Sequence, residues 1–268
     1  MSFSIAGKTA VVTGAANGVG LAIARHFADR GANVMFADMD EGRLKREFGA
    51  SSDQANMRYF SCDLRERLSV ANLLSATIDA FDRVDILVNA SRQVVTSDPL
   101  DPDDQSLDQL LRQNLLTGYR LSQQFARRMI QQAEKEADNE APAGTIINIS
   151  SIAARRVQQG LLAYSVSAAA VDQVTRALAV ELAPRRIRVN GIAFGSVMSA
   201  SLQGALKEHE EYRDEIRGHT PLARIAEASE LAEVAQFLAS DGSGFMTGQI
   251  LTVDGGRTLV DPVVAPAH

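Results

Sequence analysis

The sequence contains a single cysteine and only four histidines among its 268 residues. One cysteine, Cys62, excludes a disulfide framework within the chain, and we interpret it as a strand or core thiol of a cytoplasmic protein. The histidines show no metal-ligand spacing, so we expect no metal site. They are His26, His209, His219 and His268.

Positive charge and long apolar runs are also scarce. The net charge is −6, and because phosphate binding needs clustered Lys and Arg, we expect no nucleic-acid partner. No apolar run reaches the roughly 18 residues of a membrane span, and the N-terminus lacks the shape of a signal peptide. We therefore expect no membrane partner.

The rest of the composition is that of an ordinary soluble domain, with 46% hydrophobic and 22% charged residues. Short apolar runs alternate with longer stretches of helical spacing, which indicates a parallel sheet covered by helices on both faces. We predict one α/β domain over residues 1–268, a Rossmann-type doubly wound parallel sheet. A substrate lid is expected at about 199–224 and a C-terminal tail at 258–268. The expected strands are 8–14, 33–40, 57–64, 85–91, 145–151, 187–195 and 249–256.

A glycine-rich turn follows the first expected strand and opens the first expected helix. In VVTGAANGVGLAIA, the residues Gly14, Gly18 and Gly20 permit a tight turn. They also let backbone N–H groups approach a pyrophosphate at the helix N-terminus. A plain strand-to-helix turn is the alternative interpretation, but the position between a strand and a helix favours dinucleotide binding.

The second expected strand ends at Asp38, 18 residues after Gly20. A carboxylate there can accept hydrogen bonds from both ribose hydroxyls of an adenosine, and it would repel a 2′-phosphate. The nearest basic residues, Arg43 and Lys45, come later in the chain. We therefore predict NAD(H) in preference to NADP(H); the alternative is that Asp38 only starts a loop.

Several segments, in the same order, resemble the short-chain dehydrogenase/reductase family between about residue 5 and residue 257. They are the glycine loop (13–20), CDL (62–64), LVNA (87–90), QNLLTG (113–118), INISS (147–151), RIRVNGIAFG (186–195) and MTGQILTVDGG (246–256). The resemblance implies Ser151 and Tyr164 as catalytic residues, Asn114 as the holder of a proton-relay water, and Asp63 beside the adenine. It also implies a cofactor-binding set of Gly14, Asn17, Gly18, Val19, Gly20, Asp38, Met39, Asp63, Leu64, Asn89, Ala90, Tyr164, Gly195 and Val197.

The chain departs from the family pattern at the active site. The family's Tyr-x-x-x-Lys runs from Tyr164 to Ala168 here, so alanine replaces the lysine. The family's Asn-Ala-Gly ends in Ser91, which adds either a hydrogen bond or crowding near the expected cofactor ribose. The family's Pro-Gly after the sixth strand begins with Phe194.

The missing lysine bears on proton transfer. In the family mechanism a tyrosine exchanges a proton with the substrate oxygen, which requires a phenolic pKa lowered from about 10 towards neutral. A lysine four positions later shares the helix face and stabilises the phenolate. Without it we expect turnover lower by up to two or three powers of ten, roughly. A replacement cation could come from Lys207 in the lid, or from Arg155 or Arg156 in the loop before Tyr164, whereas Lys8, Lys45 and Lys135 belong far away.

The sequence thus predicts an NAD-dependent oxidoreductase that transfers hydride between nicotinamide and a secondary alcohol or ketone, with Tyr164 as acid/base. One alternative is a nucleotide-binding pseudoenzyme, or a regulatory or partner subunit, in which Tyr164 only packs. Another keeps the hydride chemistry for C=C reduction or dehydration–reduction. The resemblance also implies a homo-oligomer, a tetramer or dimer, built from the helices carrying Asn114 and Tyr164 and from the last strand.

Overall fold

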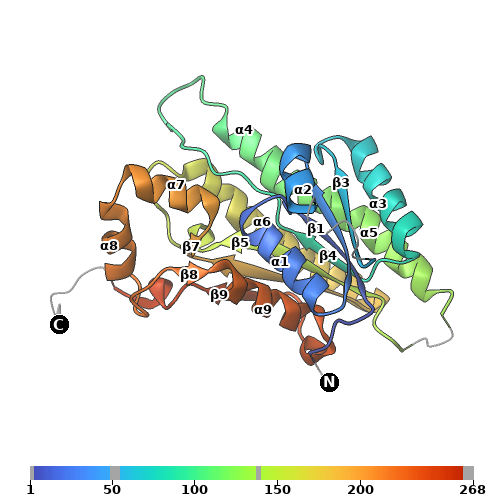
Figure 1. Cartoon of the computed structure of the whole chain (residues 1–268). Helices are drawn as coiled ribbons and strands as arrows, with labels where there is room; N and C mark the ends of the chain where they lie inside the picture. The colour runs from blue at the N-terminus through green and yellow to red at the C-terminus, as the bar shows by residue number, and fades with distance from the viewer. Residues whose placement is uncertain (1–2, 49–54, 137–139, 262–268) are drawn as a thin grey trace.

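A parallel sheet forms the centre of the computed structural model, which describes residues 3–48, 55–136 and 140–261 (Figure 1). Its strands are β1 (Thr9–Thr13), β2 (Asn33–Asp38), β3 (Met57–Ser61), β4 (Ile86–Asn89), β5 (Gly144–Ser151), β6 (Ile187–Phe194) and β9 (Ile250–Val253). Among the described residues they form one seven-stranded sheet in the order β3-β2-β1-β4-β5-β6-β9, with parallel neighbours. The predicted doubly wound sheet is confirmed.

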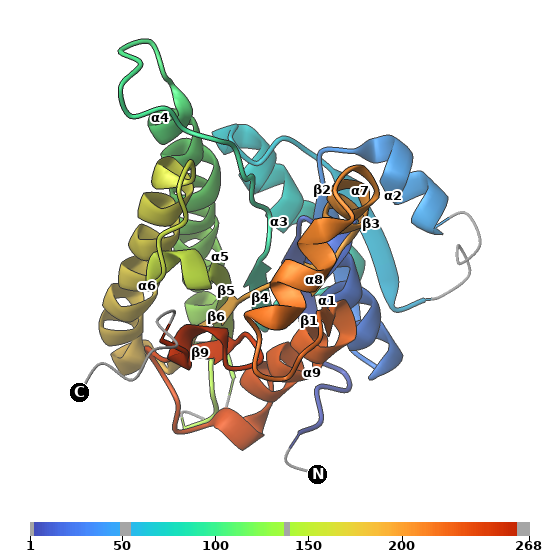
Figure 2. The ribbon, with the colours of Figure 1, turned by 90° about the vertical axis from the view of Figure 1, so that its left-hand side faces the viewer.

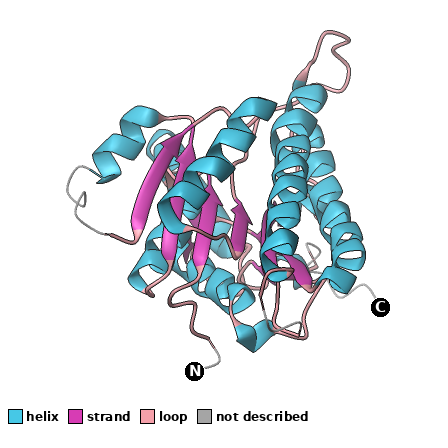
Figure 3. Ribbon diagram, turned by 90° about the vertical axis from the view of Figure 1, so that its right-hand side faces the viewer, coloured by secondary structure: helices cyan, strands magenta, loops and turns pink. Residues whose placement is uncertain are grey.

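Helices cover both faces of this sheet (Figure 3). One apolar core joins the sheet to α1 (Gly18–Asp29), α2 (Glu41–Phe48) and α9 (Ala228–Ala239). A second core joins the other face to α3 (Arg67–Phe81), α5 (Thr117–Ala133) and α6 (Leu162–Leu182). Such two-sided cover explains the near-continuous apolar strands: all five residues of β1 are buried. None of the described helices is long and apolar enough to span a bilayer.

The strand order reverses between β1 and β4, which are neighbours although β2 and β3 separate them in the chain. Connections from the two strands leave in opposite directions at that point, so a crevice opens beyond their carboxyl ends. Ligands of doubly wound folds bind there. The segments after β1 and β4 are therefore the first place to look for a site.

The segment predicted as a lid, residues 199–224, follows β6 in the chain and contains two short helices. These are α7 (Ala200–Glu208) and α8 (Glu211–Gly218), which Figure 2 shows projecting in front of the sheet. They stand between β7 (Val197–Met198) and β8 (Ala226–Glu227), and these two strands pair with each other. The predicted tail, 258–268, is described only as far as residue 261; its remainder lies outside the described residues.

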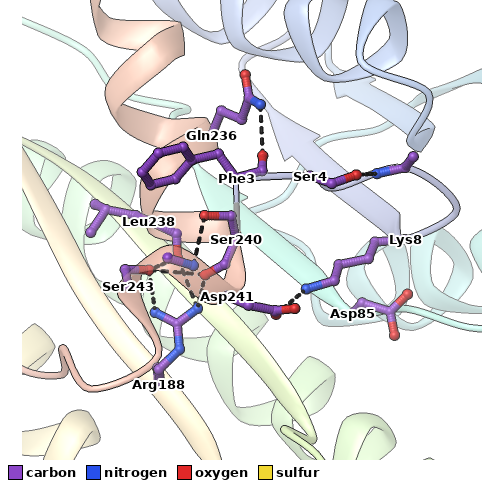
Figure 4. Close-up of polar contacts among 12 residues, drawn as sticks. Phe3, Ser4, Lys8, Asp85, Arg188, Gln236, Leu238, Ser240, Asp241 and Ser243 are labelled. Atoms are coloured by element: carbon purple, nitrogen blue, oxygen red, sulfur yellow. Dashed lines mark hydrogen bonds and ion pairs between the residues drawn. The ribbon is translucent and has the colours of Figure 1, made fainter. Parts of the chain in front are cut away.

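The amino ends of the strands are tied together by polar contacts (Figure 4). Arg188, near the start of β6, donates hydrogen bonds to the carbonyl oxygens of Leu238 and Ser240, at 2.9 and 3.2 Å. Lys8, before β1, lies 2.8 Å from a carboxylate oxygen of Asp241. Lys8 is thereby held at the edge of the sheet opposite the crevice, as the sequence indicated.

Candidate active site

The glycine loop between β1 and α1 has no room for side chains at two of its three glycines. A Cβ on Gly14 would lie 2.8 Å from the carbonyl oxygen of Ala90 and 2.9 Å from Cα of Ser91. A Cβ on Gly20 would collide with the carbonyl oxygen of Gly14. Gly14 and Gly18 also have positive φ angles of +67° and +57°, which favour glycine. The loop is therefore shaped to bring backbone close to a ligand.

A cleft of about 980 Å³ opens at the carboxyl edge of the sheet. Of the residues predicted to bind the cofactor, all except Asn89 line it, and so do the predicted catalytic residues Ser151 and Tyr164. Asn89 points instead into a small adjoining cavity, where its amide nitrogen donates to Oδ1 of Asn148 at 2.8 Å. A cleft of this volume and composition is of the kind that holds cofactors.

Carboxylates gather where β2 and β3 end, at one end of the cleft. Asp38 accepts hydrogen bonds from the backbone N–H groups of Ala16 and Asp40, at 3.1 and 3.0 Å. Asp63 is paired with Arg65, whose Nη2 lies 2.6 Å from Oδ2, and this hydrogen bond lowers the pKa of Asp63. Burial, and then the two neighbouring aspartates, raises the pKa of the Cys62 thiol to about 12.

Ser151 and Tyr164 lie on different elements that meet at the cleft. Ser151 ends β5, and its Oγ accepts a hydrogen bond from the N–H of Ala153 at 3.2 Å. Tyr164 lies in the first turn of α6 and is buried, with 6% of its surface exposed. Ala168, four positions later on the same helix, is buried as well. A serine and a tyrosine that face one cleft can both bond to a substrate oxygen.

Asn114 lies in a π-helical turn, Leu111–Leu116, a rare geometry that occurs often at functional sites. Its Oδ1 accepts from the N–H of Gln93 at 2.8 Å, and its Nδ2 donates to the carbonyl oxygen of Gln93 at 3.0 Å. Nδ2 also lies 3.2 Å from Oγ of Ser167. The Asn114 side chain therefore holds the segment after β4 against α6. That Asn114 also binds a relay water stays a prediction.

A cation does approach Tyr164, and it is none of those considered from the sequence. Arg92, in the segment after β4, donates a hydrogen bond from Nη1 to the hydroxyl oxygen of Tyr164. Its guanidinium carbon lies 4.2 Å from the ring centroid of Phe194 and 5.7 Å from that of Tyr164. The position of Arg92 at the carboxyl end of β4 was the signal that could have found it, because these strand ends converge on the cleft.

Of the three replacement cations that the sequence suggested, Arg156 lines the same cleft as Tyr164, but Arg155 and Arg156 are bonded to other residues. Arg155 donates to Oγ1 of Thr252 at 2.9 Å, and Arg156 donates to the carbonyl oxygen of Thr258. Lys207 is not among the described residues that line the cleft. Arg92 comes from the segment after β4 and is 72 positions away from Tyr164 in the chain.

Comparison with known proteins gives the family. A family model described as Enoyl-(Acyl carrier protein) reductase matches residues 14–258. The chain is 34% identical over 262 residues to galactitol 2-dehydrogenase (L-tagatose-forming) of Cereibacter sphaeroides, covering 96% of this chain and 97% of that protein. The chain belongs to the short-chain dehydrogenase/reductase family. The resemblance seen in the sequence is thus confirmed at the level of the family.

Solved structures of the short-chain dehydrogenase/reductase family show the same fold with nicotinamide cofactors. A gluconate 5-dehydrogenase from Burkholderia cenocepacia J2315, in complex with NADP and tartrate, superposes with a TM-score of 0.84 at 29% identity, covering 97% of this chain and 98% of that one. A 7α-hydroxysteroid dehydrogenase complexed with NADH and 7-oxo glycochenodeoxycholic acid gives 0.86 at 28% identity, covering 95% and 96%. These relatives hold both cofactor types, so kinship alone does not choose between NAD and NADP.

Proposed function

We propose that this protein is an NAD-dependent oxidoreductase that interconverts a secondary alcohol and a ketone. The observation that carries the proposal is the single cleft that joins the glycine loop, Asp38, Ser151 and Tyr164. A nicotinamide dinucleotide, when bound, supplies the hydride acceptor or donor. Galactitol 2-dehydrogenase, gluconate 5-dehydrogenase and 7α-hydroxysteroid dehydrogenase carry names of this reaction type, which supports the same class of substrate here.

The residues around the cleft fit such a cofactor. Gly14 lies close to the segment after β4 and has no Cβ, so the loop before the N-terminus of α1 exposes backbone there. A pyrophosphate at this point would accept hydrogen bonds from the N–H groups of the helix. Asp38 at the end of β2 would accept from the adenosine ribose hydroxyls. Ala90, Gly195 and Val197 line the same cleft as Tyr164 and would border the nicotinamide half.

Tyr164 and Ser151 would handle the substrate oxygen. In ketone reduction the proton of the Tyr164 hydroxyl passes to the oxygen, and in alcohol oxidation the phenolate takes it back. The Ser151 hydroxyl donates a hydrogen bond that holds the oxygen in place. Burial of Tyr164 excludes water from this contact, which strengthens both interactions.

The charges of the cleft lining where β2 and β3 end favour NAD over NADP. Near the ends of β2 and β3 the described lining of the cleft contains Asp38 and Asp63 and no lysine or arginine. A 2′-phosphate placed there would face the Asp38 carboxylate, and Arg65, the arginine beside Asp63, is already paired with the Asp63 carboxylate.

The first test measures binding and turnover. The protein should melt at a higher temperature with NADH than with NADPH at equal concentration, since a ligand at about 100 times its dissociation constant stabilises by about 2.7 kcal/mol. Secondary alcohols, polyols and hydroxy acids should give NADH formation, and Tyr164→Phe should lower it at least about a hundredfold while NADH still raises the melting temperature. Equal or stronger stabilisation by NADPH contradicts the cofactor choice, and full activity of Tyr164→Phe contradicts the mechanism.

The binding-only alternative has lost its main argument. It rested on the absence of a cation beside Tyr164, and Arg92 now contacts that hydroxyl. Tight NADH binding without turnover across the whole substrate panel is the outcome that would revive it.

A further inference from the structure

We propose that Arg92 is a positioning residue for proton transfer: it holds the Tyr164 hydroxyl and stabilises the deprotonated form of this tyrosine from the loop after β4. The contact itself is independent of any activity, and its catalytic meaning rests on the function proposed above. The cation absent from position 168 of α6 is thus supplied by a different element of the fold.

The chemistry of the contact favours the phenolate. A guanidinium has hydrogen-bond donors only and stays protonated in proteins. A charge-assisted hydrogen bond to an oxygen is stronger when that oxygen carries a negative charge. When Tyr164 gives its proton to a substrate oxygen, the phenolate left behind pairs with Arg92. In the reverse direction the same pair receives the proton, and Arg92 keeps its own protons throughout.

Both backbone neighbours of Arg92 are fixed by side chains from other elements. The N–H of Ser91 donates to Oγ1 of Thr13 at 3.1 Å, which ties it to β1. Gln93 exchanges two hydrogen bonds with the Asn114 side chain, at 2.8 and 3.0 Å. The Cα of Arg92 is therefore held between two anchored residues, and its side chain starts from a defined point.

The Arg92 side chain is guided by an aromatic surface. Its guanidinium carbon lies 4.2 Å from the ring centroid of Phe194, a residue at the end of β6 that is only 4% exposed. A guanidinium this close to a ring face is attracted by the ring quadrupole, and the planar group stacks well there. Phe194 therefore directs Arg92 towards the Tyr164 hydroxyl.

Three departures from the family pattern meet in this one contact. Phe194 forms the platform, Ser91 precedes Arg92, and Ala168 leaves space on the helix face that Tyr164 shares. A lysine at position 168 would bring a second positive charge towards Arg92, and like charges at such a distance disfavour each other. An alanine at position 168 is therefore compatible with an arginine at position 92.

Other charged groups near Tyr164 do not offer a competing partner. Asp172, on α6 itself, is already partnered: its Oδ2 lies 4.0 Å from Nη2 of Arg155, and its Oδ1 accepts a hydrogen bond from Oγ of Ser150 at 2.6 Å. Asp108 of α4 (Ser106–Leu110) and Arg112 of the π-helical turn Leu111–Leu116 are exposed. The remaining titratable and charged residues along the described cleft lining are Asp38, Cys62, Asp63, Arg156, Glu215, His219 and Arg257.

The test is an ultraviolet titration of tyrosinate in the ligand-free protein, which needs no turnover. The chain has no tryptophan and four tyrosines, so the absorbance of ionised tyrosine is easily resolved. The step that disappears in Tyr164→Phe identifies Tyr164. Arg92→Gln, at a half-buried position, removes the positive charge that contacts the Tyr164 hydroxyl and should therefore move this step to higher pH.

Two further variants distinguish whether the charge of Arg92 or its packing causes the shift of the Tyr164 step. Arg92→Lys keeps the charge and should retain at least half of the difference between the parent protein and Arg92→Gln. Ala168→Lys, added to Arg92→Gln, should lower the step again from the neighbouring helix turn. The proposal is overturned if Arg92→Gln leaves the Tyr164 step in place, or if Arg92→Lys behaves like Arg92→Gln.

Turnover gives a second, separable readout. The pH at which alcohol oxidation reaches half of its maximum should move upwards in Arg92→Gln by the same amount as the absorbance step. If no variant, the parent included, turns over any alcohol, the proposed function fails while the titration still decides the role of Arg92. If turnover is present and its pH profile is the same in Arg92→Gln as in the parent protein, the inference about Arg92 fails and the proposed function stands.

Discussion

Cys62 is the one thiol of the chain, and it lines the cleft with Asp38 and Asp63, where β2 and β3 end. Burial is the larger cause of its raised pKa, about 12, and the charges of Asp38 and Asp63 add to it. A rise from 9.0 to about 12 lowers the thiolate population at pH 8 about a thousandfold. Because the thiolate is the nucleophile, and a thiolate of higher pKa is intrinsically more reactive, we expect iodoacetamide to alkylate Cys62 more slowly than a free thiol, by about tenfold or more.

Asp38→Asn provides the matched control for this measurement. It keeps the shape of the site and removes one of the two charges that disfavour the thiolate, so alkylation should become faster. NADH should slow alkylation in the parent protein by covering the same end of the cleft. Alkylation of the parent at the rate of an exposed thiol would contradict the description of this site.

At the level of single residues, the sequence allowed accurate prediction only where local geometry decides. Gly14 and Gly20 could be assigned to a tight turn because no side chain fits, and the structure places backbone where their Cβ atoms would be. Arg92 could not be found in this way. Its contact with Tyr164 joins residues 72 positions apart, and it depends on the order of strands and not on spacing along the chain.

At the level of elements, strand prediction was most successful because burial on both faces leaves a clear apolar signature. Each expected apolar run overlaps a strand of the sheet, as in Thr9–Thr13 within 8–14. The π-helical turn at Leu111–Leu116 was not predicted, since a wider turn has no distinct sequence period. The lid was expected as one segment, and the structure divides it into two helices, α7 and α8.

The start of α9 permits a quantitative test at this scale. Glu230 closes a capping box with Glu227, accepting from its N–H at 2.9 Å, and it forms a double hydrogen bond with Arg224 at 2.6 and 2.7 Å. The bonds from Arg224, and then from the N–H of Glu227, lower the pKa of Glu230 to about 2. Since the pair is partly exposed, we expect Glu230→Gln to cost only about 0.5–1 kcal/mol at pH 7.

The sign of the pH dependence follows from the lowered pKa. The stabilisation by Glu230 is fully present above its ordinary value of 4.5 and is lost as the pH falls through about 2. Urea unfolding of the parent and Glu230→Gln should therefore differ at pH 7 and converge near pH 2. Glu233→Gln, on the same helix but outside the cap, should cost less at pH 7; an equal cost would argue against the capping contribution.

At the level of the whole molecule, α6 joins the active site to the surface. Tyr164 lines the cleft and Ala168 lines the small adjoining cavity, whereas Leu162, Val166 and Val180 are exposed, Val180 by 74%. Single exposed apolar residues are common, but these three recur at helical spacing and share one face of the helix. The expected homo-oligomer would cover that face, and the helix that positions Tyr164 would then be supported from both sides.

Val180→Glu tests this arrangement. A charge buried in an apolar interface is costly, so light scattering after size exclusion should find the parent as a dimer or tetramer and Val180→Glu in a smaller state. Leu68→Glu, on α3 and 73% exposed, is the matched control and should leave the assembly intact. Because α6 carries Tyr164, the smaller state should also lose turnover in parallel with mass. A parent that remains monomeric at micromolar concentration, or an equal effect of Leu68→Glu, would exclude α6 as the interface.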